Sequence, residues 1–144
     1  MRKPVWKQMQ LWWDQYQFKR YVADYFLYLS QLMQATQGQR TLHTIFALDV
    51  QRYGLTTYRG RLAQLWLQRY EQNGGDLAQT WVGVLSAMDR LVIQMGQARG
   101  DQALAIAFAL LAEQHQQFRH LRSQLGSLLV VSSQTSRSLA IILR

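Results

Sequence analysis

The chain has 144 residues, of which 49% are hydrophobic and 17% charged, and it carries a formal net charge of +8 with a pI near 10.3. This length and apolar content suffice for one domain with its own core and exclude a disordered composition. Cysteine is absent, which excludes disulfide bonds and thiolate metal sites.

The positive charge suits three kinds of partner: nucleic acid, an anionic membrane surface or an acidic protein. No apolar run in the sequence approaches the length of a membrane span. The N-terminus is basic, but no long apolar core follows it, so we do not interpret it as a signal peptide.

The first predicted helix has the clearest pattern. Apolar residues from Phe18 to Met33 recur at three-four spacing, which is typical of one helix face. The helix is expected to begin as early as Leu11 and to end near Gly38. One continuous helix is therefore predicted for this region.

Two further helices follow in the first half of the chain. Thr41 is placed to cap the second helix, which Gly54 closes. The third is expected to begin near Thr56–Thr57 and to end at Asn73-Gly74.

Two glycine-aspartate corners separate the helices of the second half. The first is Gly74-Gly75-Asp76, and the second runs from Gly96 to Gly100-Asp101. Glycine supplies the left-handed conformation that ends a helix. Each aspartate, Asp76 and Asp101, is expected to cap the next helix by accepting bonds from its free amides.

These corners define three more predicted helices. Asp76 starts a fourth, and the Ser86/Asp89 spacing predicts a break before a fifth. The fifth is expected to carry Met88, Leu91, Val92 and Met95 and to end at Gly96 and Gly100. The sixth and longest carries one stripe composed of Leu104, Phe108, Leu111, His115, Phe118 and Leu125.

The predicted fold is thus all-α, a compact antiparallel bundle of about six helices joined by short links. We divide the chain into a basic aromatic N-terminal segment (1–16), a helical bundle (17–131) and a loosely ordered tail (132–144). The tail is expected because it is rich in serine and threonine.

No motif in the sequence predicts catalysis, a metal site or a cofactor. The three histidines, His43, His115 and His120, lack metal-ligand spacing, and His115 is expected to be half-buried on the apolar stripe. The Gly96–Gly100 spacing lacks the Gly-Lys-Ser/Thr of a phosphate-binding loop. We therefore expect a protein that is not an enzyme.

Aromatic residues and cations alternate near the N-terminus: Trp6, Trp12, Trp13 and Tyr16 lie among Arg2, Lys3, Lys7, Lys19 and Arg20. Three interpretations stay open. The aromatic side chains could pack on the bundle, contact a membrane or membrane protein, or stack on single-stranded nucleic acid.

Arginine is the main source of positive charge, and it favours bidentate pairing with carboxylates and phosphates. A solvated basic face is the default interpretation, and an acidic partner protein is the more specific one. The partner-binding residues we predict are Arg59, Arg61, Arg69, Arg119 and Arg122, with Trp12 and Trp13.

Residues 70–125 resemble the cytoplasmic domain of the F-protein or PilC-like inner-membrane platform family of type II secretion systems and type IV pili. Gly74-Gly75-Asp76-Leu77 matches the first glycine corner of that domain, and residues 96–101 match the second. Arg119-His120-Leu121-Arg122 matches the basic end of its long helix. Gln97 departs from the pattern, since it stands where the family has a glutamate.

The resemblance implies a helical bundle that is no enzyme and needs no cofactor. It would lie at the cytoplasmic face of the bacterial inner membrane, contact the assembly ATPase and other machinery proteins, and continue into membrane spans after residue 144. Homodimerisation stays open. The alternative is a basic helical module that binds nucleic acid, which we expect less.

Overall fold

The structure is a computed structural model that describes residues 3–37 and 41–142. These residues form α-helices and connecting turns, with no strand in either described range. The predicted all-α bundle is therefore confirmed, although it has one more described helix than expected. The helices are α1 (Val5–Arg20), α2 (Val22–Ala35), α3 (Leu42–Tyr53), α4 (Tyr58–Gln72), α5 (Leu77–Thr80), α6 (Ala87–Arg99) and α7 (Asp101–Ile142).

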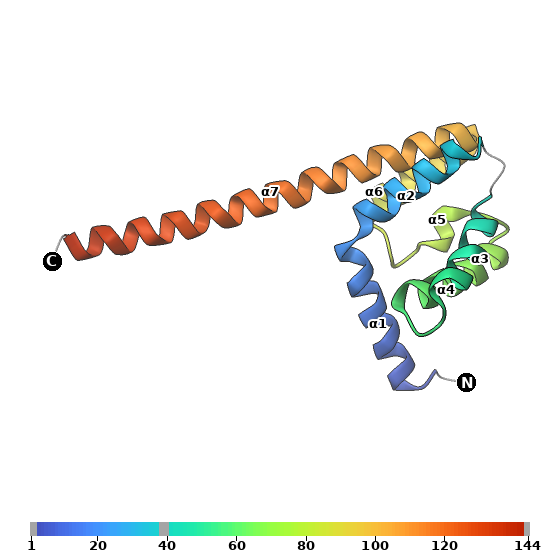
Figure 1. Cartoon of the computed structure of the whole chain (residues 1–144), viewed down its shortest axis with the longest axis horizontal. Helices are drawn as coiled ribbons and strands as arrows, with labels where there is room; N and C mark the ends of the chain where they lie inside the picture. The colour runs from blue at the N-terminus through green and yellow to red at the C-terminus, as the bar shows by residue number, and fades with distance from the viewer. Residues whose placement is uncertain (1–2, 38–40, 143–144) are drawn as a thin grey trace.

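The helices make a bundle with one long arm (Figure 1). Helices α2 and α6 pack along the first half of α7, and α3 packs against α4. Helix α1 packs on α4 and diverges from α2 at a sharp corner. The second half of α7 extends beyond the bundle.

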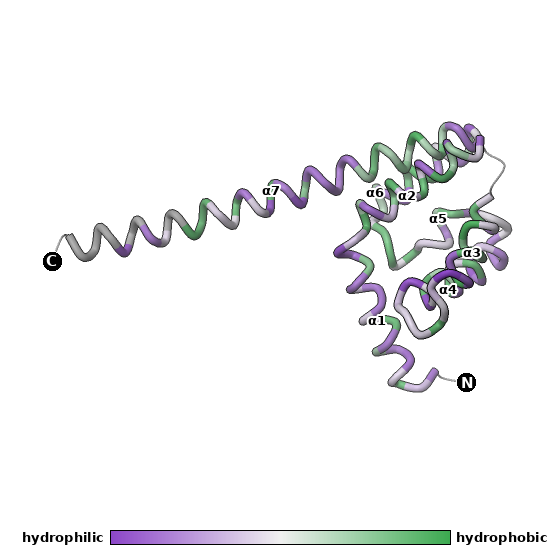
Figure 2. Tube along the Cα trace, viewed as in Figure 1, coloured by the Kyte–Doolittle hydropathy of each residue, from purple (hydrophilic) through white to green (hydrophobic). Residues whose placement is uncertain are grey.

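The core is centred on Trp81, which the short helix α5 places inside the bundle. Its ring lies edge-on to those of Phe26, Phe46, Trp66 and Phe108, with centroids 6.0–6.3 Å apart. Edge-to-face pairs contribute about 0.5–1.5 kcal/mol each beyond the burial of their area. The four partner residues come from α2, α3, α4 and α7, so one aromatic cluster holds four helices together. Hydrophobic residues line α2 and the first half of α7 in Figure 2.

Four of the predicted helix starts are confirmed by their hydrogen bonds. Thr41, Thr57 and Ser86 each accept a bond from the backbone amide three residues later. The Asp76 carboxylate accepts bonds from two amides in the first turn of α5. These side chains stabilise the helices by satisfying amides that have no partner within the helix.

The first glycine corner ends α4 as a Schellman motif. The amide of Gly75 donates to the carbonyl of Tyr70 at 2.8 Å, and the amide of Gly74 donates to that of Glu71 at 3.3 Å. Both glycines have positive φ, 62° and 85°. The corner therefore needs glycine for its backbone conformation, as predicted.

The second corner differs from the prediction in two details. Gly96 lies inside α6, which ends at Arg99 before Gly100. A Cβ atom at Gly96 would lie 2.9 Å from that of Ala107, so this glycine lets α6 approach α7 closely. Asp101 is the first residue of α7 rather than its cap. Its charge still suits the positive end of the helix dipole there.

The prediction of one helix over Phe18–Met33 is wrong. The backbone breaks at Tyr21, which has φ −121° and ψ 16°, and so α1 and α2 are separate. Helix α2 ends at Ala35, and the predicted end near Gly38 lies outside the described residues. The predicted boundary between residues 16 and 17 falls within α1.

Several apolar residues of the predicted helices are exposed, and the predicted loosely ordered tail is helical as far as Ile142. On α6, Met88, Leu91 and Met95 face solvent, while Ile93 is fully buried. Phe118 and Leu125 are also exposed, because α7 has left the bundle by that point. Helix α7 continues past Ser132 to Ile142, where the sequence predicted a loosely ordered tail.

Candidate interaction surface

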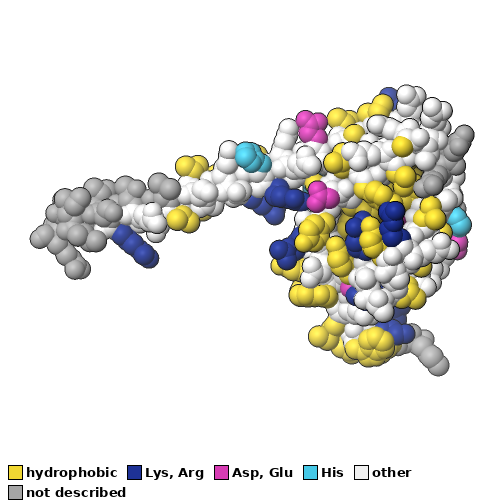
Figure 3. Space-filling model, viewed as in Figure 1, with side chains coloured by type: hydrophobic (Ala, Val, Ile, Leu, Met, Phe, Trp, Pro, Cys, Tyr) yellow, Lys and Arg dark blue, Asp and Glu magenta, His cyan; other side chains and the backbone are white. Residues whose placement is uncertain are grey.

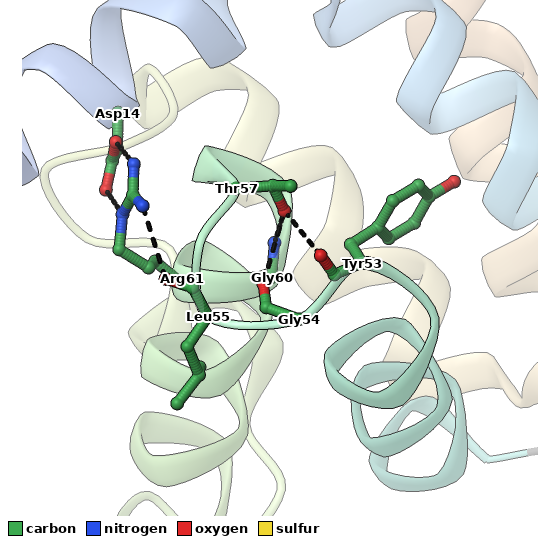
Figure 4. Close-up of polar contacts among 7 residues, drawn as sticks. All are labelled: Asp14, Tyr53, Gly54, Leu55, Thr57, Gly60 and Arg61. Atoms are coloured by element: carbon green, nitrogen blue, oxygen red, sulfur yellow. Dashed lines mark hydrogen bonds and ion pairs between the residues drawn. The ribbon is translucent and has the colours of Figure 1, made fainter.

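Arg61 of α4 forms a bidentate ion pair with Asp14 of α1 (Figure 4). Its Nε and Nη2 atoms each donate to one oxygen of the Asp14 carboxylate at 2.8 Å. Asp14 is only 2% exposed, and the guanidinium also donates to the carbonyl of Leu55. The carboxylate raises the pKa of Arg61. This predicted partner-binding residue is therefore engaged inside the protein, where it fastens α1 to α4.

The other two arginines predicted on α4 also make internal contacts. Arg69 donates from Nη1 to the carbonyls of Thr80, the last residue of α5, and of Val82, which follows that helix. The Arg59 guanidinium lies 4.2 Å from the ring centroid of Tyr53, a cation–π arrangement. Both side chains are half-buried, so they offer less free charge than the sequence implied.

A basic groove lies where α7 leaves the bundle beside the corner between α1 and α2. It encloses about 870 Å³ and is open to solvent. Arg119 donates to the carbonyl of Arg20 at 3.0 Å, which joins two segments 99 residues apart. Figure 3 shows lysine and arginine side chains gathered at this place. The groove is lined by Tyr16, Lys19, Arg20, Tyr21, Val22, His115, Phe118, Arg119 and Arg122.

The two predicted tryptophans lie on the outer surface of α1. Trp12 is 65% exposed and Trp13 52%, and both rings stack against Tyr16 with centroids 5.9 Å away. Packing on the bundle, one of the three interpretations of these aromatic residues, is therefore wrong for Trp12 and Trp13. Tyr16 also lines the basic groove, so the aromatic surface and the groove are continuous.

Gln97 joins the two glycine corners. Its Nε2 atom donates to the carbonyl of Gly75 at 2.6 Å, and its Oε1 accepts from the amide of Leu77 at 3.1 Å. A glutamate could accept the second bond but could not donate the first at neutral pH. Glutamine, whose side chain has both a donor and an acceptor, therefore has a structural role at this position.

Two further pairs of polar side chains lie elsewhere in the bundle. His115 Nε2 lies 2.8 Å from the carboxylate of Asp89, which ties α7 to α6 and confirms that His115 is half-buried. Tyr28 donates to Asp49 at 3.1 Å. Burial, together with the neighbouring Asp49 charge, raises the pKa of Tyr28 to about 12. Burial likewise raises the pKa of Asp49.

The interior next to Asp49 has little free space. A cavity of about 10 Å³ lies between Asp49, Tyr25 and Arg59. This volume holds about one water molecule and no organic substrate. Within residues 3–37 and 41–142, no three His, Cys, Asp or Glu side chains are grouped so that they could hold a metal ion. The same residues include no helix both long and apolar enough to cross a bilayer.

Comparisons with known proteins give no match: no protein-family model, no curated protein and no solved structure is significantly similar to this chain.

Sequence reasoning missed how the basic residues are grouped. Arg119 and Arg122 were predicted as partner-binding residues, but Lys19 and Arg20 were considered only as cations beside the N-terminal aromatic residues. The structure brings all four to one groove and leaves Arg59, Arg61 and Arg69 elsewhere on α4. No local signal marks this grouping, because it depends on the break at Tyr21.

Proposed function

We propose that this chain is a non-enzymatic cytoplasmic domain of an inner-membrane platform protein for type IV pilus or type II secretion assembly. In this role it contacts the assembly ATPase and other machinery proteins. The observation that carries the proposal is the pair of glycine corners, whose spacing resembles the platform family and which Gln97 joins directly. A confirmed all-α bundle is compatible with it.

The basic groove is the surface on which we place the acidic partner. Four cations from two helices, Lys19, Arg20, Arg119 and Arg122, line it. Cations grouped in this way speed the encounter with an acidic surface and select against basic ones. The mechanism is mechanical, since a bundle locked by one aromatic cluster moves as a unit when a partner changes conformation.

A pulldown with the cognate assembly ATPase tests the proposal. The variant is Arg119→Glu/Arg122→Glu, and the control is Arg52→Glu/Arg99→Glu, which changes the net charge equally at exposed positions on α3 and α6. Arg61 is excluded from the test because its reversal would break the Asp14 pair. We expect the groove variant to lose binding and the control to keep it. Equal binding by wild type and groove variant would remove this role.

Nucleic-acid binding remains the second candidate, favoured by the same four cations beside the rings of Tyr16 and Phe118. Stacking and phosphate contacts would then act together. A salt titration with a DNA or RNA oligomer separates the two functions. Tight binding at low salt with a steep salt slope would support nucleic acid, whereas negligible binding at physiological salt would exclude it.

A further inference from the structure

Helix α1 has two opposite faces, and only one of them is covered. Leu11, Asp14 and Phe18 face α4 and are buried or half-buried. At 3.6 residues per turn, Val5, Met9, Trp12 and Tyr16 fall on the opposite side of the helix. Trp6 and Trp13 lie next to that stripe. We call these six residues the outer face of α1. Their exposed fractions run from 47% to 70%, so the bundle leaves this face uncovered.

The exposed charges of α1 itself all have one sign. Helix α1 contains one acidic residue, Asp14, which is buried and paired with Arg61. Its exposed charges are Lys7, Lys19 and Arg20. The Lys7 ammonium lies 5.5 Å from the ring of Trp6. At the last turn of the helix, Arg119 and Arg122 of α7 add two more cations.

We propose that the outer face of α1 docks on the surface of an anionic lipid bilayer. Tryptophan and tyrosine are enriched at the level of lipid headgroups, because their rings are apolar at one end and form hydrogen bonds at the other. Lysine and arginine beside them contact lipid phosphates. The outer face combines these two features and carries no exposed carboxylate.

A second copy of the chain fits this surface less well. Two α1 helices packed face to face would bring the cations of both copies together, and α1 has no exposed acidic residue to pair with them. Like charges brought together at an interface are costly. The charge pattern is complementary to an anionic surface and not to itself.

The basic groove continues this surface from α1 onto α7. Tyr16, Lys19 and Arg20 line it together with Phe118, Arg119 and Arg122. The cations at the end of α1 and those of α7 therefore lie on one continuous surface.

The test is co-sedimentation of the full chain with phosphatidylcholine vesicles, with and without phosphatidylglycerol. We expect binding that requires phosphatidylglycerol and weakens as salt rises. Each cation near an anionic surface contributes on the order of 1 kcal/mol, so Lys19→Gln/Arg20→Gln should bind about 30-fold more weakly. The matched control Arg52→Gln/Arg99→Gln should bind like wild type, although it removes the same charge.

Two further measurements address the aromatic residues. Trp12→Ser/Trp13→Ser should weaken vesicle binding at least about tenfold, because it removes two side chains that anchor the helix at the membrane interface. The temperature of thermal unfolding should stay unchanged, because both side chains are exposed. Brominated lipids should quench the wild-type tryptophan fluorescence. Trp66 and Trp81 are at most 2% exposed, so the quenching reports on the tryptophans of α1.

Three results would overturn the proposal. The first is absence of binding to anionic vesicles at low salt. The second is an equal loss of binding in the control variant. The third is a dimer in lipid-free solution that the tryptophan substitutions dissociate, which would assign the outer face to a second copy. The vesicle assay contains no ATPase, so its outcome is independent of the platform proposal.

Discussion

The ion pair between Asp14 and Arg61 gives the sharpest prediction for stability. Arg61→Gln removes both 2.8 Å bonds and leaves a carboxylate that is 2% exposed without its cation. Breaking a buried pair in this way costs 3–5 kcal/mol. Water can reach the site, because the Arg61 side chain is 26% exposed, so we expect the lower end, about 3 kcal/mol. For a chain of this size that corresponds to a fall in Tm of about 10 °C.

The loss of stability in Arg61→Gln should be concentrated in α1, because this helix packs mainly on α4. Hydrogen exchange should therefore show α1 amides losing protection first, while α2 and α7 keep theirs. A double-mutant cycle with Asp14→Asn should give a coupling energy of about 2 kcal/mol, because the neutral amide needs no cation. Arg52→Gln, at an exposed position, serves as the control. If Arg61→Gln costs no more than this control, the buried-pair reasoning is wrong.

Three further predictions follow from local geometry. Gly60→Ala would place a Cβ atom 1.7 Å from the backbone carbonyl oxygen of Gly54, so it should lower the free energy of unfolding in urea by more than about 3 kcal/mol. Gly126 lies in open space on α7, and Gly126→Ala should instead raise the free energy of unfolding by up to about 1 kcal/mol. Gln97→Glu should lower the free energy of unfolding by about 2 kcal/mol at neutral pH, because the carbonyl of Gly75 loses its donor. At low pH the new carboxyl group is protonated and can donate, so the stability should recover in unfolding measurements there. The free energy of unfolding should fall as pH rises from 10 to 12, because Tyr28 has a pKa of about 12 in the folded chain and loses its proton at lower pH in the unfolded chain. Tyr28→Phe should make this dependence of stability on pH less steep.

The sequence by itself determined where α3, α4, α5 and α6 begin. Thr41, Thr57, Asp76 and Ser86 cap as predicted, because a cap depends on residues within one turn of each other. The stop at Gly74-Gly75 is equally local, since it needs only a residue that tolerates positive φ. The buried stripe of α2 was visible too, because the three-four spacing reports which side of a helix is covered.

Only the tertiary structure decided where the continuous pattern from Phe18 to Met33 would break. Tyr21 carries no glycine or proline signal, yet α1 turns there to pair Asp14 with Arg61 while α2 stays on α7. That turn leaves the aromatic face of α1 uncovered and brings Arg20 next to Arg119. Helix α1 carries apolar residues on two opposite sides, and the spacing of these residues in the sequence cannot show which side packs on the core. That choice depends on contacts between residues far apart in the chain. The helices were thus encoded locally, and the candidate surface arises from how they pack.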